Sequence, residues 1–234
     1  SVDGDTAVVG ARLDDDGGSN SGSAYVFQFD GSQWQQQQKL TASNPDRYDF
    51  FGDCVSLSGD TVIVGASGDD DGGSSAGAVY VFRFTGVSWI QQQKLIASDA
   101  ETSANFGLSA SLSGDAAIVG AHCDGAGGSY VGAAYFYRRL GGQWVEQYKF
   151  HPSDIDRSHQ FGYAVSLSGH TAIVGMPYGT PAESTPGSAY LYTLWPPSDC
   201  FAVNVRAGDS LAVSTAPPAG GTGWGPPPGW QNQQ

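Results

Sequence analysis

Short runs in which apolar residues alternate with polar ones fill most of the chain, and clusters of Gly, Ser and Asp separate them. In the segment 51–105 this pattern predicts strands at 54–58, 61–66, 78–84 and 88–98. The second run is almost continuously apolar, which predicts a strand buried on both faces. The fourth run is the most polar and is expected to be an outer, half-solvated strand. The segment therefore predicts a unit of four antiparallel strands, and we expect the chain to be all-β.

This unit repeats every 55 residues without drift. The residues that recur in phase include glycine, tyrosine, tryptophan and lysine: Gly10, Gly65, Gly120 and Gly175; Tyr25, Tyr80, Tyr135 and Tyr190; Trp34, Trp89 and Trp144; Lys39, Lys94 and Lys149. Four-stranded units that follow one another at such a period are typical of the blades of a β-propeller. We therefore predict propeller-type units at about 1–50, 51–105, 106–160 and 161–195.

Both end units depart from the repeat. The first is expected to lack its opening strand, because Ser1-Val2 aligns with Ser56-Leu57 and the Phe-Gly segment is absent, and the fourth has Asp199 where the period requires Trp. We expect both units to be incomplete, followed by an extra β-hairpin at 196–216 and an extended Pro/Gly/Trp-rich tail at 217–234. Within the tail, Trp224 and Trp230 are candidate assembly contacts, unless the tail is disordered. Three arrangements would cover the open units: a longer parent chain, two chains in one ring, or a head-to-tail filament.

The charge of the chain excludes some partners. The net charge is −13, and the three lysines all recur at one repeat position, so they form no basic patch. Nucleic acid and anionic membrane surfaces are therefore not expected partners, whereas cations are attracted. No apolar run approaches the ~20 residues of a membrane-spanning helix, so we predict no membrane insertion. Glutamine runs at 35–38 and 91–93 lie in predicted outer strands and indicate either a polar strand edge or pairing between chains.

Two acidic loops at one repeat position are the candidate metal site. Each has three consecutive aspartates followed by two glycines, and the six carboxylates are those of Asp14, Asp15, Asp16, Asp69, Asp70 and Asp71. Carboxylate oxygens are ligands that Ca²⁺ takes in proteins, so Ca²⁺ is the candidate cofactor in the first two units. The alternative is a solvated turn formed by Asp and Gly. The loop keeps one Asp in the third unit and none in the fourth, where we expect no calcium.

The cysteines lie at unrelated repeat positions and so do not form a repeated metal site. The three, Cys54, Cys123 and Cys200, permit one disulfide plus a free or intermolecular thiol. Cys200, near the irregular end, is a further candidate assembly contact, whereas Cys54 fits equally well as a small buried side chain. The sequence contains no nucleophile elbow, no histidine metal motif and no evident acid pair for glycoside hydrolysis, and we predict that the chain is not an enzyme.

Several words of the repeat recur together: an opening Phe-Gly pair, VSLSGDTVIVGA at 55–66, and Gly-Ala-x-Tyr-x-Phe at 77–82. Over about 1–195 they resemble the FG-GAP repeat, the blade of integrin-α-type β-propellers and of bacterial secreted and surface proteins. The Trp-x4-Lys-Leu strand and the Asp-rich loop resemble the bacterial subtype. The resemblance implies an extracellular or cell-surface, bacterial location and seven blades in a closed ring. It also implies structural Phe-Gly pairs between blades: Phe51, Gly52, Phe106, Gly107, Phe161 and Gly162.

The chain departs from integrin-type blades at one loop, and its C-terminal part resembles a different domain. Integrin-type blades have a calcium loop between their first two strands, but here only 57–60 lies there, which is too short to wrap a cation. The family's calcium sites are therefore not carried over. Near the C-terminus, the words at 207–209 and 214–217 resemble the opening of a bacterial pre-peptidase C-terminal domain.

These observations give three hypotheses for function. The first is a non-enzymatic extracellular structural or adhesive module that self-associates through its incomplete blades into a homo-oligomer or a filament. The second is a calcium-supported propeller that binds an extracellular protein or glycan through loops on one face. The third, from the C-terminal resemblance, is an accessory domain of a secreted hydrolase.

Overall fold

The computed structural model describes residues 1–125, 131–151, 159–178, 186–194 and 200–206. Within these ranges the chain forms sixteen strands, which pair into four antiparallel sheets of four strands each. Every sheet follows chain order, β1-β2-β3-β4 and so on to β13-β14-β15-β16. This confirms the all-β prediction and the four-stranded unit. No helix of membrane-spanning length and apolarity occurs in the described residues.

The bounds of the strands repeat from sheet to sheet. They are β1 Val2–Asp3, β2 Thr6–Ala11, β3 Ser23–Phe29, β4 Trp34–Leu40, β5 Phe51–Ser58, β6 Thr61–Ala66, β7 Ala78–Phe84, β8 Trp89–Leu95, β9 Ser109–Ser113, β10 Ala116–Ala121, β11 Ala133–Leu140, β12 Gln143–Phe150, β13 Ala164–Ser168, β14 Thr171–Tyr178, β15 Pro186–Leu194 and β16 Cys200–Arg206.

The second sheet shows how the sequence pattern sets the strands. All six residues of β6 are buried, as its continuous apolar run predicts. Because side chains alternate across a strand, Val62 and Val64 pack toward the first sheet while Ile63 packs toward the third. The tight turn between β5 and β6 places Gly59 at φ 57°, a conformation that glycine adopts without steric cost. The outer strand β8 is buried only at its two ends, Trp89 and Leu95, and is exposed or half-buried between them.

The hydrophobic core is divided into three clusters, and each cluster lies between two consecutive sheets. The first joins Val8 and Val26 of the first sheet to Val62 and Val64 of the second. The second joins the second sheet to the third, and the third joins the third sheet to the fourth. Each sheet is therefore a blade that buries its faces against its neighbours, as in a propeller or a repeat array.

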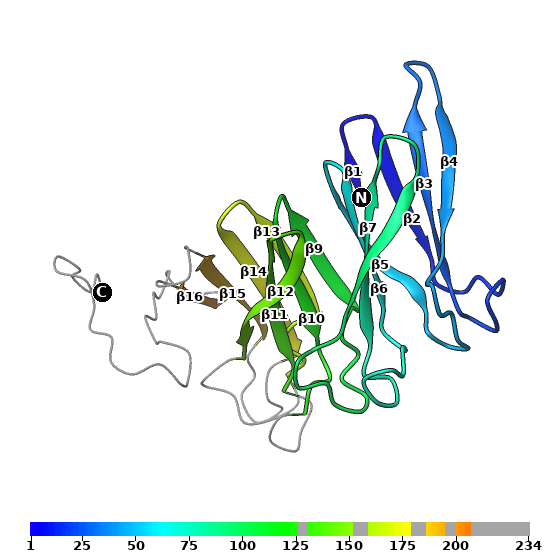
Figure 1. Ribbon diagram of the computed structural model, residues 1–234. Coiled ribbons are helices and arrows are strands. Elements are labelled where there is room, and N and C mark those ends of the chain that lie inside the picture. The colour runs from blue at the N-terminus through cyan, green and yellow to red at the C-terminus, as the bar shows by residue number, and fades with distance from the viewer. Residues whose placement is uncertain (126–130, 152–158, 179–185, 195–199, 207–234) are drawn as a thin grey trace.

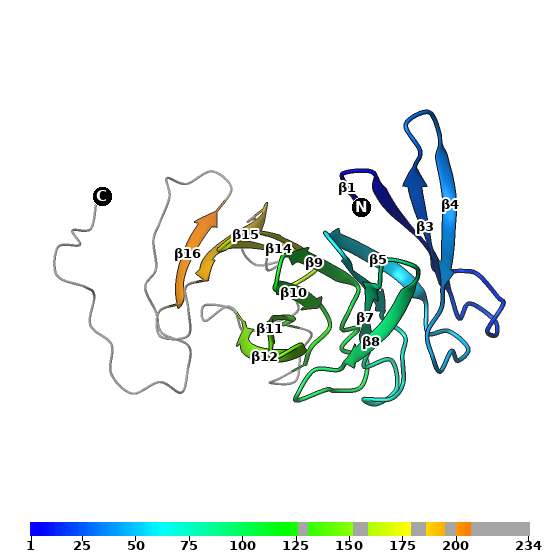
Figure 2. The same ribbon diagram turned by 45° about the horizontal axis from the view of Figure 1, so that its top comes forward.

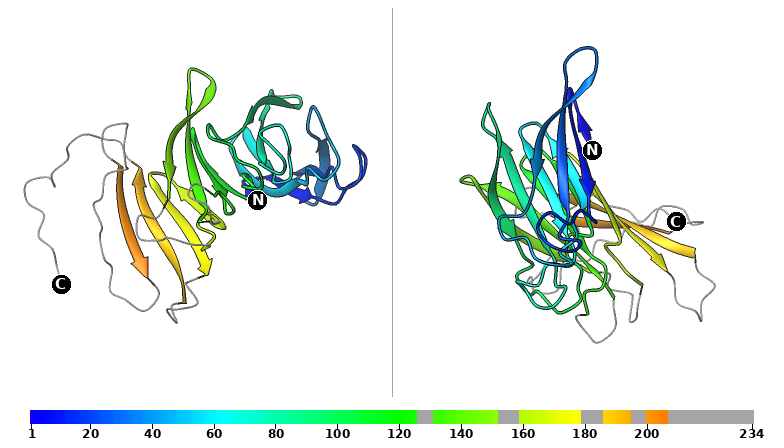
Figure 3. Two further views of the ribbon diagram at one scale, coloured as in Figure 1. Left: turned by 90° about the horizontal axis from the view of Figure 1, so that it is seen from below. Right: turned by 90° about the vertical axis from the view of Figure 1, so that its right-hand side faces the viewer.

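The four blades lie side by side in chain order, as Figure 1 shows. The first blade, drawn in blue, and the fourth, drawn in yellow to orange, lie at opposite ends of the row in Figures 1 and 2. The innermost strands β5, β9 and β13 contact one another in turn. Figure 3 shows the same open fan from two further directions. In the described residues, the first blade has no neighbour before it and the fourth has none after it.

The end blades differ in part from the expected incomplete units. The first blade does have an opening strand, β1, which is two residues long where β5 of the second blade has eight. In the fourth blade, β16 pairs with β15 along 200–206 and fills the place of the fourth strand. The loss of Trp at position 199 therefore does not end the sheet, since ladder pairing requires only backbone groups. Of the hairpin expected at 196–216, this strand is the described part, and 207–216 and the tail 217–234 lie outside the described residues.

Candidate assembly surface

The Phe-Gly pairs join each blade to the one before it. Phe51 forms an isolated parallel bridge with Gly22 of the first blade, and its N–H donates to the Ser21 carbonyl at 3.0 Å. Its ring is fully buried and meets Tyr80 edge-on, with centroids 5.3 Å apart. Phe106 and Phe161 repeat both contacts one and two periods later. The following glycines, Gly52, Gly107 and Gly162, have φ of 97°, 90° and 85°, which explains their type.

A glycine on the second strand of each blade lies under the Phe-Gly segment of the next. A Cβ added to Gly65 would lie 1.9 Å from the Gly107 carbonyl oxygen, which is sterically impossible without a backbone shift. Gly10 and Gly120 have the same neighbour, at 2.0 Å and 1.9 Å. At Gly175, on the fourth blade, the nearest atom would be 3.4 Å away, an ordinary contact. The following blade therefore requires this glycine at all three junctions, and at Gly65 and Gly120 a side chain of the same blade, Cys54 Sγ or Ser109 Oγ, would also be too close to a Cβ.

A ladder of side-chain acceptors runs across every junction, by which we mean the contact between two consecutive blades. The first strand of each blade points two N–H groups at side-chain oxygens of the blade before it. At the second junction, the Leu112 N–H donates to Ser56 Oγ at 2.9 Å and the Gly114 N–H to Ser58 Oγ at 3.1 Å. Ser1 and Asp3 act in the same way at the first junction, and Ser111 and Ser113 at the third. These bonds satisfy edge-strand amides that the sheet leaves unpaired.

Glutamines of the outer strands make a second cross-blade contact. The amide of Gln38 pairs with the backbone of Trp89 in both directions, at 2.8 Å each, and Gln37 Oε1 accepts from Trp89 Nε1 at 2.8 Å. Gln93 repeats the backbone pairing with Trp144 at the second junction. The glutamine runs thus pair between blades of one chain in these two places. The third blade has Tyr148 at the corresponding position.

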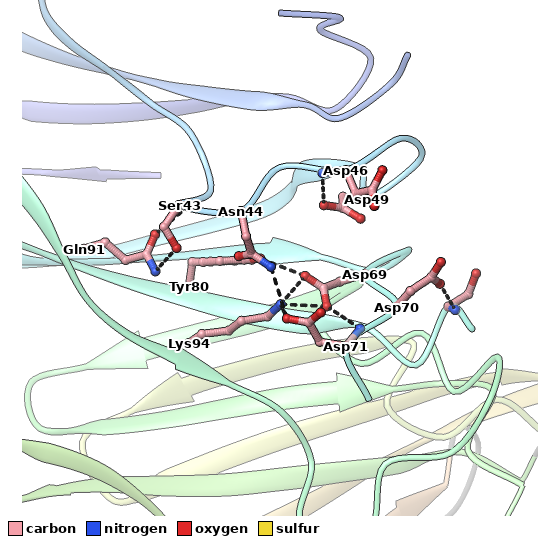
Figure 4. Close-up of polar contacts among 11 residues, drawn as sticks. Ser43, Asn44, Asp46, Asp49, Asp69, Asp70, Asp71, Tyr80, Gln91 and Lys94 are labelled. Atoms are coloured by element: carbon pink, nitrogen blue, oxygen red, sulfur yellow. Dashed lines mark hydrogen bonds and ion pairs between the residues drawn. The ribbon is translucent and has the colours of Figure 1, made fainter. Parts of the chain in front are cut away.

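The acidic loop surrounds the recurring lysine in the first three blades, and the second blade shows this most completely (Figure 4). Lys94 Nζ lies 2.7 Å from Asp69 Oδ2 and also pairs with Asp71. Tyr80 donates its hydroxyl to Asp69 at 2.7 Å, and Asn44 of the first blade donates to Asp71 at 3.1 Å. The contact with Asn44 makes the cluster part of the first junction. Lys94 holds the pKa of Asp71 below its usual range, and burial raises the pKa of Tyr80.

The third blade builds the same cluster with a different set of carboxylates. Lys149 pairs with Asp124 at 2.8 Å and with Asp99, from the connection after the second blade, at 2.7 Å. Tyr135 donates to both carboxylates. Burial works against the charge of Lys149, yet hydrogen bonds to Asp124 and Asp99 raise its pKa above the ordinary value. A repeated lysine is thus neutralised by carboxylates that come from two successive blades.

In the first blade, Lys39 pairs with Asp14 at 3.1 Å and with Asp16. The Asp16 N–H and Lys39 together lower the pKa of Asp14 to about 2. The middle carboxylates face the backbone instead: Asp15 accepts from the Asn20 N–H and Asp70 from the Ser75 N–H. In the described residues, no three His, Cys, Asp or Glu side chains are grouped so that they could hold a metal ion. A calcium ion at these loops would have to displace the lysine ammonium, and the calcium prediction stays a prediction.

The first blade exposes the face that every later blade buries. Val9 is 53% exposed, while Val64 and Val119, at the same repeat position, are 0% exposed. Trp34 is 45% exposed against 5% for Trp89. Val2 is 64% exposed against 6% for its counterpart Leu57. We call this surface, made of Val2, Gly4, Val9 and Trp34, the head face.

The opposite end of the row has its own open surface. Ile173 is 42% exposed, although its counterparts Ile63 and Ile118 are 0% exposed against a following blade. Ser166 and Ser168, the counterparts of the ladder acceptors, are exposed as well. We call the surface made of Ser166, Ser168 and Ile173 the tail face.

The sequence that forms these blades and junctions matches a family model. The model of the FG-GAP repeat matches four segments, 1–27, 34–82, 89–137 and 144–192, which together cover most of the chain. The chain belongs to the FG-GAP repeat family. Its blades are therefore FG-GAP blades, and the resemblance drawn from the sequence is confirmed. A search of curated protein sequences finds no match to this FG-GAP chain.

Solved structures similar to these FG-GAP blades share the architecture only distantly. The N-terminal domain of Nup159 aligns with a TM-score of 0.48 at 10% identity over 92% of this chain, which spans 50% of that domain. An Aleuria aurantia lectin mutant in complex with α-methyl-L-fucoside aligns with a TM-score of 0.39 at 10% identity, covering 92% of this chain and 80% of the lectin.

The predicted assembly residues at the C-terminal end cannot be placed on either face. Trp224 and Trp230 lie outside the described residues, and of Cys200 only the backbone, in β16, is described. Cys54 and Cys123 are free thiols, and Cys54 Sγ donates to the Gly107 carbonyl at 3.1 Å across the second junction. Trp34, Trp89 and Trp144 mark the outer strands, with Trp34 and Trp89 opening β4 and β8 as the repeat predicts.

Sequence reasoning missed the residues that carry most of the junction. These are the ladder acceptors Ser56, Ser58, Ser111 and Ser113 and the partners of the lysine clusters, Asn44 and Asp99. A signal was present, because the serines recur in phase as SLS and Asn44 and Asp99 are one period apart. The pattern alone assigned those positions to strand and turn.

Proposed function

We propose that this FG-GAP chain is a non-enzymatic, extracellular structural or adhesive module that self-associates through its end blades. The observation that supports the proposal is the head face. Its apolar positions are those that the preceding blade covers at each internal junction, and in the described residues nothing covers them on the first blade. Large apolar side chains exposed together on one face favour association in water.

The chemistry of the recurring polar residues supports a structural role for the rest of the molecule. The lysines, tyrosines and acidic residues that recur in phase bind one another within a blade. Asn44 and Asp99 join two of these clusters to the preceding blade, which supports a role in holding blades together. An extracellular location agrees with the family, since FG-GAP repeats occur in extracellular proteins. Binding of a protein or glycan with calcium, and a role beside a secreted hydrolase, stay predictions.

Light scattering on the purified 234-residue chain over a wide concentration range tests the proposal. We expect the mass to rise with concentration, and negative-stain images to show larger particles or fibres. Trp34→Ser should reduce the association because it removes a large exposed ring from the head face. Val87→Ser is the control, since Val87 lies in an exposed turn and is 86% exposed. A constant monomer mass at every concentration would rule the proposal out.

A further inference from the structure

The two open faces carry the two complementary halves of an internal junction. At the third junction, the earlier blade presents Ser111 Oγ and Ser113 Oγ, which accept from the N–H groups of Leu167 and Gly169 at 2.9 and 3.0 Å. Beside this ladder, Ile118 of the earlier blade joins the same buried cluster as Val174 of the later one. The earlier blade thus supplies two acceptors and an isoleucine, and the later blade supplies two donors and a valine.

Both sets recur at the ends of the row. One period after the acceptors, the tail face has Ser166, Ser168 and Ile173. Three periods before the donors, the head face has Val2, Gly4 and Val9. The isoleucine and the valine are exposed on these faces, and both serines are exposed too.

We propose that the tail face of one copy binds the head face of a second copy in the register of an internal junction. This inference rests on the self-association proposed above and specifies its geometry. Ser166 Oγ accepts from the Val2 N–H, Ser168 Oγ accepts from the Gly4 N–H, and Ile173 packs against Val9. The occupant of each face is therefore another copy of this chain.

Pairing of unlike faces is favoured over pairing of like faces by the hydrogen-bonding groups. Two head faces would offer each other amide donors from Val2 and Gly4 at the ladder positions, with no acceptor supplied. The unlike pairing satisfies those donors with hydroxyl oxygens, as the second and third junctions do, whereas the first junction uses Ser1 Oγ and a carboxylate oxygen of Asp3. Such a contact is heterologous, so it extends into an open chain of copies or closes into a ring.

The contact between copies is smaller than an internal junction. Internal junctions also include a Phe-Gly bridge such as that of Phe51 with Gly22, and residues 1–4 have no counterpart of that segment. We therefore expect association that is reversible and depends on concentration, whereas the internal junctions are held by the connected chain.

Two variants that each block one face distinguish this geometry from other modes of association. Val9→Asp places a carboxylate on the head face, and Ile173→Asp places one on the tail face. Both residues are about half exposed, so the fold should be kept, which circular dichroism melting checks. Each variant alone should form no larger species than a monomer. An equimolar mixture should form a one-to-one dimer, because each variant still has the face that the other lacks.

A second pair of variants tests the ladder itself. Ser166→Ala and Ser168→Ala are introduced into the Val9→Asp chain, whose tail face is its only unblocked face, and this chain is mixed with Ile173→Asp. The affinity of the mixed dimer should fall by about tenfold, since two neutral hydrogen bonds are lost. Ser74→Ala in the same background is the control, because Ser74 is an exposed loop serine of the second blade.

The outcomes separate the two proposals. If the unmodified chain associates and Ile173→Asp still self-associates while Val9→Asp does not, like head faces pair and the proposed register is wrong. If the mixture stays monomeric although the unmodified chain associates, the register is also wrong. If the unmodified chain is a monomer throughout, the proposed function fails and this inference fails with it.

Discussion

Val9 on the first blade and Val64 on the second occupy the same position of the repeat, yet one is half exposed and the other is fully buried. The same contrast separates Trp34 from Trp89. In the described residues, Val9 lacks both a preceding blade and a strand partner such as Val55, which pairs with Val64, since β1 has two residues where β5 has eight. Burial of one valine side chain contributes about 1.5–3 kcal/mol, and an end blade lacks that contribution on its open face. Stability in this molecule is thus supplied mainly at the junctions, as in other repeat arrays.

The largest contrast is expected between the two tryptophans. Trp89→Ala should lower the free energy of unfolding by about 4 kcal/mol, because it empties a buried site and removes the hydrogen bond to Gln37. Trp34→Ala should lower it by about 1 kcal/mol, since nearly half of that side chain is already in water. Urea unfolding followed by circular dichroism measures both. Equal losses would mean that the first blade is covered in solution.

The recurring glycines give the next largest contrast. Gly65→Ala should cost about 3 kcal/mol, because the new Cβ would overlap the Gly107 carbonyl oxygen. Gly175→Ala should change the free energy of unfolding by less than about 0.5 kcal/mol, since the same atom meets only ordinary contacts there. Urea unfolding of the two variants checks this pair. A large loss at Gly175 would show that a blade follows the fourth one.

The stability lost when the tyrosine hydroxyl is removed should differ between the lysine clusters of the first two blades. Tyr80→Phe should cost about 2 kcal/mol, because Asp69, a carboxylate that is 2% exposed, loses a hydrogen bond at 2.7 Å. Tyr25→Phe should cost about 0.5 kcal/mol, since its partner Asp14 is more exposed. Thermal melting of both variants at neutral pH measures the difference. A larger effect at Tyr25 would contradict the assignment of this cluster to the junction.

The first junction also holds a titrating group that the second lacks. Asp49 is buried, and burial raises its pKa from 3.8 to about 6; the corresponding residue of the second junction is Ala104. Because the folded pKa lies above the unfolded one, the associated stability is full below about pH 4 and is lost as the pH rises through 6. Asp49→Asn should therefore stabilise the chain by about 1 kcal/mol at pH 7 and have little effect at pH 4.

Thermal melts between pH 4 and pH 8 test this, with Asp5→Asn as a control that removes an exposed carboxylate of the first blade. An equal shift in both variants would assign the effect to net charge and not to burial of Asp49.

Calcium should produce the smallest effect. The ammonium groups of Lys39 and Lys94 already lie among the carboxylates, so millimolar calcium should raise the melting temperature by less than about 1 °C. The double variant Lys39→Gln, Lys94→Gln removes this competition and should respond more strongly. A rise of several degrees in the unmodified chain, reversed by a chelator, would support the calcium hypothesis over the lysine clusters.

Most of the blade could be predicted from the sequence, because alternation and the period act locally. The runs at 61–66 and 78–84 are the observed bounds of β6 and β7. The acidic loop was located too, but its partner was not. Lys94 reaches it because the β7–β8 register places Lys94 opposite Tyr80, and Tyr80 contacts Asp69. The in-phase recurrence of Lys and Asp indicates that each residue has a role in the unit, but it does not show that their side chains contact each other.

The pattern did not predict the ladder, and it predicted a hairpin at 196–216 without showing that β16 would complete the fourth blade. When a serine hydroxyl accepts from the backbone of another blade, the side chain of its partner shows no sign of the contact, since every residue type except proline has an N–H. β16 lies where the periodic residues stop, and only backbone pairing extends the sheet there. Both contacts depend on the backbone, to which side-chain patterns are insensitive.

The serine ladder has a consequence for how the chain is made. At every junction the acceptors lie on the earlier blade and the donors on the later one. During synthesis, a finished blade therefore leaves the ribosome with serine hydroxyls that only the next segment to emerge can engage. Each blade in turn becomes the template on which its successor docks, and the order of translation is then also the order of stacking.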